Sequence, residues 1–216
     1  MRGPRSLNLA AKVALVALLA HAALLPDLPQ YQGKGIGYRL ALYPLSAAVV
    51  PAIWFVRRRW GAPPARRYPH LIDLCVVLPF LIDTAGNAAN LYDTVTWWDD
   101  LMHVVTWVPW VVAFGLTVRH WPVGRLVTAG LTVGFGAVTH ILWEIAEYLT
   151  FVADNPNESA SAYRDTIGDL AGSLTGTILG ATVVATVLWN VGPPSAPRHP
   201  DSSERSRRSR QPNVAV

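Results

Sequence analysis

The chain has 216 residues, of which 51% are apolar and only 15% are charged, and nine are tryptophan. So few charged side chains do not solvate a soluble domain of this size, and the composition therefore favours a membrane protein. The net charge of +4 does not indicate nucleic-acid binding, because the arginines lie in short clusters between apolar runs. The single cysteine, Cys75, excludes an intrachain disulfide framework and a cysteine-based zinc site.

Apolar segments that approach or exceed the roughly 20 residues of a membrane-spanning helix occur six times. They lie at about residues 7–25, 38–56, 70–91, 100–118, 124–150 and 164–190. The sequence predicts an all-α polytopic membrane protein, with residues 1–191 forming one bundle of six transmembrane helices. Residues 192–216 are rich in Pro, Ser and Arg and predict a disordered basic tail. The first segment also resembles a signal peptide, with AHA at 20–22 as a cleavage site, but a retained helix is favoured.

The basic residues predict the orientation, because cytoplasmic connections carry the excess of Lys and Arg. Counted over alternate connections, one side receives most of the 18 basic residues, and the other receives only Lys34, Arg39 and Arg164. Lys12 lies inside the first segment. Both termini are therefore predicted to be cytoplasmic, with the basic loops next to anionic lipid headgroups.

Polar residues recur within these segments, and the predicted orientation gives them a common depth. Segment 70–91 ends with Asp83, Asn87 and Asn90. Asp99 directly precedes segment 100–118, and Asp100 and His103 lie at its start. Segment 124–150 carries His140, Glu144 and Glu147 in its second half, and segment 164–190 opens with Asp165 and Asp169. All four sets are predicted to lie in the extracytoplasmic half of the bundle.

Helical spacing gathers each set on one face. His140, Glu144 and Glu147 occupy positions i, i+4 and i+7, and Asp83, Asn87 and Asn90 repeat that spacing. In the last segment a glycine recurs every fourth residue from Gly168 to Gly180, a pattern that packs membrane helices closely. These glycines share a face with Asp165 and Asp169, so both aspartates are predicted to face other helices.

An ionisable side chain at mid-membrane costs about 2.5 to 3.5 kcal/mol on insertion scales, so this collection requires compensation. Six carboxylates near two imidazoles leave excess negative charge, and the remainder is expected to hold protons or to bind a cation. Simpler interpretations exist for some members: Asp99 or Asp100 as a helix N-cap, and Asp165 as a first-turn residue. The HxxxExxE pattern of 140–147 is the most specific signal.

Three stretches, DDLMH, WEIAEY and DTIGDLAGSLTG, resemble in order and spacing the YjdF-like family of bacterial integral membrane proteins, and more distantly the VanZ-like membrane proteins. The resemblance covers about residues 70–190. It singles out Asp99, His103, Glu144, Glu147, Asp165 and Asp169. The stretch NPNESASAY departs from the family pattern before the last pair of aspartates. The resemblance implies a multi-pass protein of the bacterial plasma membrane, and it implies no reaction.

Three functions remain open at this point. The first is a metal-dependent membrane enzyme that acts on an envelope lipid or ester, using Mg, Mn, Fe or Zn. Its predicted metal ligands are Asp99, His103, His140, Glu144, Glu147, Asp165 and Asp169. The second is a proton- or cation-coupled transporter, although segments 100–118, 124–150 and 164–190 are apolar in their cytoplasmic halves. The third is a structural or partner-binding membrane protein whose polar cluster locks the bundle.

Overall fold

The computed structural model describes residues 3–60, 68–149 and 159–190, and these ranges are helical, without strands. Six long helices have the length and hydropathy to cross a membrane, which confirms the predicted fold class. They are α1 (Pro4–Leu24), α2 (Ile36–Arg59), α3 (His70–Ala88), α5 (Trp98–Val118), α6 (Arg125–Glu147) and α7 (Ser159–Thr186). Two short helices, the 3-10 helix η1 (Pro29–Tyr31) and α4 (Leu91–Thr94), lie in the connections.

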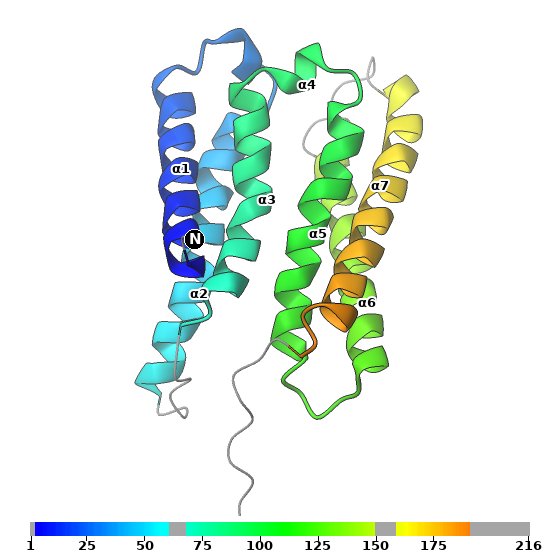
Figure 1. The fold of residues 1–216 in the computed structure, drawn as a ribbon. Coiled ribbons are helices and arrows are strands. Elements are labelled where there is room, and N and C mark those ends of the chain that lie inside the picture. Colours follow the sequence, from blue (N-terminus) through cyan, green and yellow to red (C-terminus); the bar gives the residue numbers. More distant parts are fainter. Residues whose placement is uncertain (1–2, 61–67, 150–158, 191–216) are drawn as a thin grey trace, which may run out of the picture.

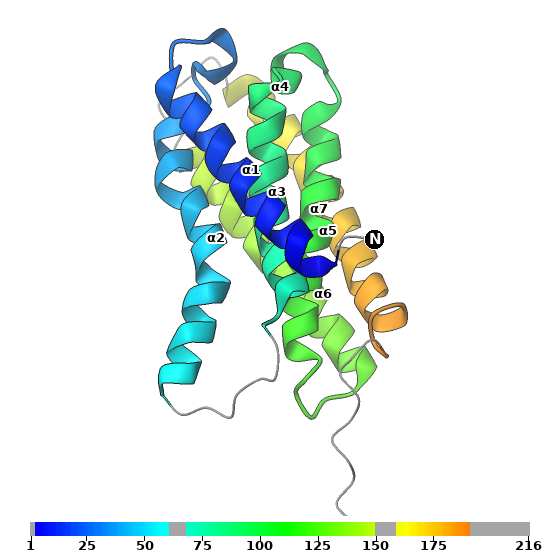
Figure 2. The ribbon, with the colours of Figure 1, turned by 60° about the vertical axis from the view of Figure 1, so that its left-hand side comes forward.

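Successive long helices run in opposite directions, so η1, α4 and the first turns of α5 and α7 gather at one end of the bundle (Figure 1). We call this the α4 end. The opposite end is called the basic end, because the last turn of α2 and the α5–α6 connection place there Arg57, Arg58, Arg59, Arg119 and Arg125. Helices α1 to α3 form one group and α5 to α7 another, and α3 packs against α5 between them (Figures 1 and 2).

Each group has its own apolar core. In the first group Leu15, Tyr43 and Val77 are buried together, and in the second Val112, Leu116 and Val184 are buried with Cys75 of α3. The outer surfaces of the helices expose many large apolar side chains instead of polar ones. This distribution fits a bundle surrounded by lipid, whose hydrocarbon solvates apolar side chains without cost.

Close packing of α7 on α5 depends on the glycine face predicted from the sequence. A Cβ atom at Gly172 would lie 3.2 Å from Cβ of His103, and one at Gly176 would overlap the backbone carbonyl of Val104. A Cβ atom at Gly180 would likewise collide with Val111. The prediction that this face contacts a neighbouring helix is therefore confirmed, and the contact brings Asp169 next to α5.

The structure differs from the sequence prediction at the end of α3. This helix ends at Ala88, and Asn90 takes the left-handed conformation (φ 57°) as the residue before α4. Asparagine tolerates this conformation better than most residues, which explains the break. Asn90 therefore does not extend the helical face of Asp83 and Asn87, and that part of the prediction is wrong. The predicted tail at 192–216 and the first four residues of the stretch NPNESASAY lie outside the described residues.

Candidate metal centre

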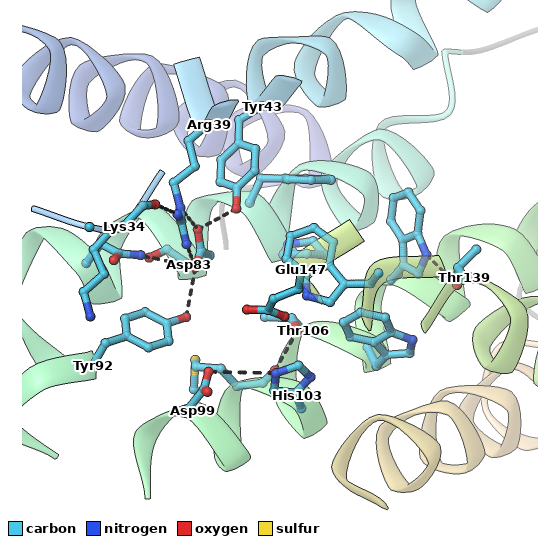
Figure 3. A pocket seen from close by; sticks show the side chains of 18 residues that line it. Lys34, Arg39, Tyr43, Asp83, Tyr92, Asp99, His103, Thr106, Thr139 and Glu147 are labelled. Carbon is cyan, nitrogen blue, oxygen red and sulfur yellow. Dashed lines mark hydrogen bonds and ion pairs between the residues drawn. The ribbon is translucent and has the colours of Figure 1, made fainter. Parts of the chain in front are cut away.

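Polar side chains surround a cavity of about 300 Å³ near the α4 end of the bundle. Its lining residues come from both helix groups and include Arg39, Asp83, Tyr92, Asp99, His103 and Glu147. Asp99, His103 and Glu147 point into this cavity from α5 and α6 (Figure 3). We call it the polar cavity. Aromatic side chains of α5 and α6, among them Trp107 and Trp143, complete its wall.

His103 of α5 is held from both sides of its ring. Its Nδ1 atom lies 3.2 Å from the hydroxyl of Ser173 on α7, and Ser173 is fully buried. Its Nε2 atom lies 3.3 Å from Oδ1 of Asp169 and 3.8 Å from Oδ1 of Asp99. One ring nitrogen is thus fixed by a neutral partner, while the other faces two carboxylates. This is the arrangement in which an imidazole presents Nε2 to a metal ion.

His140 of α6 is buried, with 3% of its surface exposed, and neither of its ring nitrogens has a hydrogen-bond partner among the described residues. The nearest acidic oxygen is Oε1 of Glu144, 3.4 Å from Nε2, and this oxygen also has no hydrogen bond there. The ring packs edge-on against Trp107, with centroids 4.8 Å apart. A buried polar group without a hydrogen bond costs free energy, and both ring nitrogens of His140 are therefore available to accept a ligand.

Two overlapping sets of three side chains place their donor atoms within 4.8 Å of one another. One set comprises His103, His140 and Glu144, and the other comprises Asp99, His103 and Asp169. Donors around one divalent ion lie about 3 to 4 Å apart, so either set needs to close by roughly 1 Å. Imidazole and carboxylate donors suit Zn, Mn or Fe, whereas Mg prefers oxygen alone. The residues therefore fit a divalent metal ion, with His103 common to both sets.

The two remaining predicted ligands lie at the margin. Glu147 lines the polar cavity but belongs to neither set of three. Asp165 is exposed and belongs to neither set, in contrast to the prediction that it faces other helices. The contact between α7 and α5 begins at about Gly168, which lies against Asp100 in the first turn of α5. Asp165 comes before this point in α7 and is therefore not covered by α5. Of the seven predicted ligands, five are therefore brought together: Asp99, His103, His140, Glu144 and Asp169.

A second network in the polar cavity was not predicted. Asp83 of α3 accepts hydrogen bonds from Arg39 Nε at 2.9 Å, Tyr43 at 2.7 Å and Tyr92 at 3.0 Å. Burial and the neighbouring Asp83 carboxylate both raise the pKa of Tyr92, which lies in α4 outside the spans and stays a donor. Asp83 is thus neutralised by Arg39. The expectation that it adds to an unpaired acidic cluster is wrong.

A third polar cluster lies far from this cavity, near the basic end. Asp73, in the first turn of α3, is fully buried and forms an ion pair with Lys12 of α1, with Nζ and Oδ2 2.6 Å apart. Asn8 and Tyr68 donate to the same oxygen, at 2.7 and 2.6 Å. The sequence offered a weak signal for this pair, because Lys12 is a lone charge within an apolar run. Pairing across α1 and α3 requires a tertiary contact that the pattern does not specify.

These features define a polytopic α-helical membrane protein with a buried polar centre near one end of its bundle. A family model described as a predicted membrane protein (DUF2238) matches residues 10–190. The chain belongs to this family, which is consistent with the YjdF-like resemblance and states no activity. No curated protein and no solved structure gives a significant match.

Proposed function

We propose that this protein is a divalent-metal-dependent membrane hydrolase, with its metal held by His103, His140 and Glu144 and supported by Asp99 and Asp169. The observation that carries the proposal is His140, whose two ring nitrogens are buried without a hydrogen-bond partner among the described residues. In a histidine that only stabilises the bundle, at least one ring nitrogen is expected to form a hydrogen bond, because burying both nitrogens without one destabilises the fold. The four other donors of the two overlapping sets come from α5, α6 and α7: Asp99, His103, Glu144 and Asp169.

The donor set and its surroundings suit hydrolysis. A bound divalent ion lowers the pKa of water and polarises a carbonyl or phosphoryl oxygen. Glu147 lines the polar cavity beside Asp99 and His103, and we assign it the role of accepting the proton of the attacking water. The aromatic wall of Trp107 and Trp143 limits the access of bulk water to that side of the cavity. The substrate class proposed is an ester or phosphoester of an envelope lipid.

We further propose that the α4 end faces the extracytoplasmic side of a bacterial plasma membrane and that both termini are cytoplasmic. The side of the bundle away from the α4 end carries six described arginines, Arg5 and the five of the basic end, whereas the described basic residues of the α4 end are Lys34, Arg39 and Arg164. Such an asymmetry sets orientation during insertion. The metal centre would then be reached from outside the cell or from the outer leaflet.

Transport across the bundle has less support than hydrolysis. Beyond His103, the buried side chains of α5 toward the basic end are Thr106, Val111, Val112, Ala113, Leu116 and Val118. In the described residues this interior continues into the apolar core around Val184. Among these described side chains of α5, a cation leaving the centre for the cytoplasm would meet no charged group.

Metal analysis of the purified full-length protein in detergent tests the proposal. We expect about one divalent ion per chain, reduced at least tenfold in His140→Ala and Glu144→Ala. The matched control is His120→Ala, which removes a histidine at the basic end and should leave the metal content unchanged. Absence of bound metal in wild type, after growth and purification with added Zn and Mn, would reject the proposal. Folding of each variant is checked by its circular dichroism and its elution volume.

A further inference from the structure

A second cavity lies between α6 and α7, on the other side of His140. Its volume is about 170 Å³, and we call it the lateral groove. Ala137 and Ile141 of α6 and Leu170 and Leu174 of α7 supply apolar walls. His140 belongs to the same lining. This groove is separate from the polar cavity, whose lining does not include His140.

The lateral groove opens toward lipid. Ile141 and Leu174 flank it and are 52% and 48% exposed, and both lie inside membrane-spanning helices. The solvent on this face is therefore hydrocarbon, which makes a fatty chain the available occupant. An apolar cavity of about 150 Å³ is large enough to hold a six-carbon ring. The groove accordingly accommodates a similar length of acyl chain.

The metal centre lies between the two cavities. His103 lines the polar cavity and His140 lines the lateral groove, and their ring centroids are only 5.6 Å apart. Ser173 connects the two directly, because it lines the groove and its hydroxyl contacts Nδ1 of His103. A molecule with an apolar chain and a polar head would therefore place the junction between them beside the two imidazoles.

We infer that the lateral groove holds the acyl chain of a membrane phospholipid whose polar end points toward the α4 end and meets His103 and His140. This inference rests on the proposed function and names its substrate class as a two-part lipid that enters sideways between α6 and α7. The polar linkage of the lipid would then lie beside the ring of His140, whose nitrogens have no hydrogen-bond partner among the described residues and are assigned above to the metal. The groove would order the chain, and the linkage would lie beside His103 and His140, the residues that would hold the metal.

Photo-labelling in vesicles tests the inference. The full-length protein is reconstituted into phosphatidylglycerol vesicles that contain a small share of phosphatidylglycerol with a diazirine in one acyl chain. After illumination, labelled peptides are mapped by mass spectrometry. We expect residues 137–141 and 170–174 to be labelled at least fivefold more than Leu42 and Leu45 of α2, which are exposed to lipid by 57% and 59%.

The position of the diazirine supplies a second readout. Because α6 runs toward the α4 end and α7 runs away from it, Ile141 and Leu170 lie closer to that end than Ala137 and Leu174. A diazirine near the headgroup should label the first pair, and one near the chain terminus should label the second. Equal labelling of all lipid-exposed helices, without this order, would overturn the inference.

Variants separate groove binding from general lipid contact. Ala137→Phe fills the groove and should reduce labelling of 170–174 at least fivefold, while Val138→Phe, at a neighbouring position that is 57% exposed, should not. Leu174→Trp tests the same space from α7 if Ala137→Phe fails to fold. Unchanged labelling in folded groove variants would count against the inference.

The outcomes also distinguish this inference from the proposed function. Ordered groove labelling in a protein that binds no metal would support the lipid site and reject the hydrolase. Stoichiometric metal without groove labelling would keep the metal centre and overturn the lateral groove as a lipid site. Metal content is therefore measured on the same samples, and Ala137→Phe should retain it.

Discussion

His103 and Asp169 meet across the α5–α7 contact, with Nε2 and Oδ1 3.3 Å apart and both side chains almost fully buried. The two residues come close because Gly172, one turn from Asp169, lies against the Cβ of His103. The centre therefore depends on the approach of two helix backbones. A change that separates α5 from α7 should weaken the site even when every ligand is retained.

Gly176→Val tests this dependence. A Cβ atom at Gly176 would overlap the backbone carbonyl of Val104, which cannot move like a side chain, so we expect a loss of about 1 to 3 kcal/mol in stability. Metal binding should weaken with it. Gly134→Val in α6 is the matched control, because a Cβ atom there has no neighbour within 4 Å. Equal stability of the two variants in a reversible SDS-unfolding experiment would show that the glycine contact is unimportant.

Ser173→Ala addresses the orientation of His103. The Ser173 hydroxyl contacts Nδ1 and thereby leaves Nε2 directed at the carboxylates. Loss of such a supporting contact typically lowers metal affinity by about 10- to 100-fold, and isothermal titration with Zn should show a change of this size. The exposed hydroxyl of Thr175 donates to the carbonyl of Ala171 in its own helix, so Thr175→Ala should leave the affinity unchanged. Identical affinities in both variants would refute a supporting role for Ser173.

The Arg39–Asp83 ion pair is expected to stabilise the contact between α2 and α3. Asp83→Ala leaves the guanidinium of Arg39 largely buried without its partner, so we expect a loss of about 3 to 5 kcal/mol. Asp93→Ala removes the partner of Lys34 in an exposed pair and should cost no more than about 1 kcal/mol. SDS-unfolding midpoints compare the two. A smaller loss for Asp83→Ala than for Asp93→Ala would contradict this account.

The buried pair of Lys12 and Asp73 lends itself to a double-mutant cycle. Lys12→Met leaves a fully buried carboxylate without its cation and should destabilise α1 against α3 by several kcal/mol, about 3 to 5 on the usual scale. Combining it with Asp73→Leu removes both charges and should restore much of that loss. If the loss in the double variant equals the sum of the losses in the two single variants, the two side chains are not coupled.

The sequence was sufficient to predict the spans and one of the helix contacts. Apolar segments with turn-forming residues between them located all six long helices to within a few residues, because a bilayer demands that length. The four-residue glycine repeat identified the face of α7 that packs on α5, because only small residues allow backbones so close. His103, His140 and Glu144 were predicted as ligands, and the structure places them together.

The sequence did not predict which charged side chains form ion pairs between helices. Arg39 was counted with a connection and Asp83 was placed on a polar helix face with two asparagines, and nothing in their local pattern indicates that α2 and α3 bring them to 2.9 Å. The prediction that Asp165 faces other helices was also wrong, because helical spacing gives a direction but not the point at which a neighbouring helix begins to cover that face. Asn90 illustrates a further limit, since its left-handed backbone ends the helix where the periodic pattern continues.

X-ray absorption spectroscopy at the edge of the bound metal tests the central claim most directly, because it reports the ligands themselves. For protein loaded with Zn, the account predicts two imidazole nitrogens and additional oxygens at about 2.0 to 2.2 Å. In the residual Zn that His103→Ala and His140→Ala each retain when the metal is added in excess, the imidazole contribution should fall to one. A metal-free protein, or a bound ion whose spectrum contains no imidazole, would contradict the account.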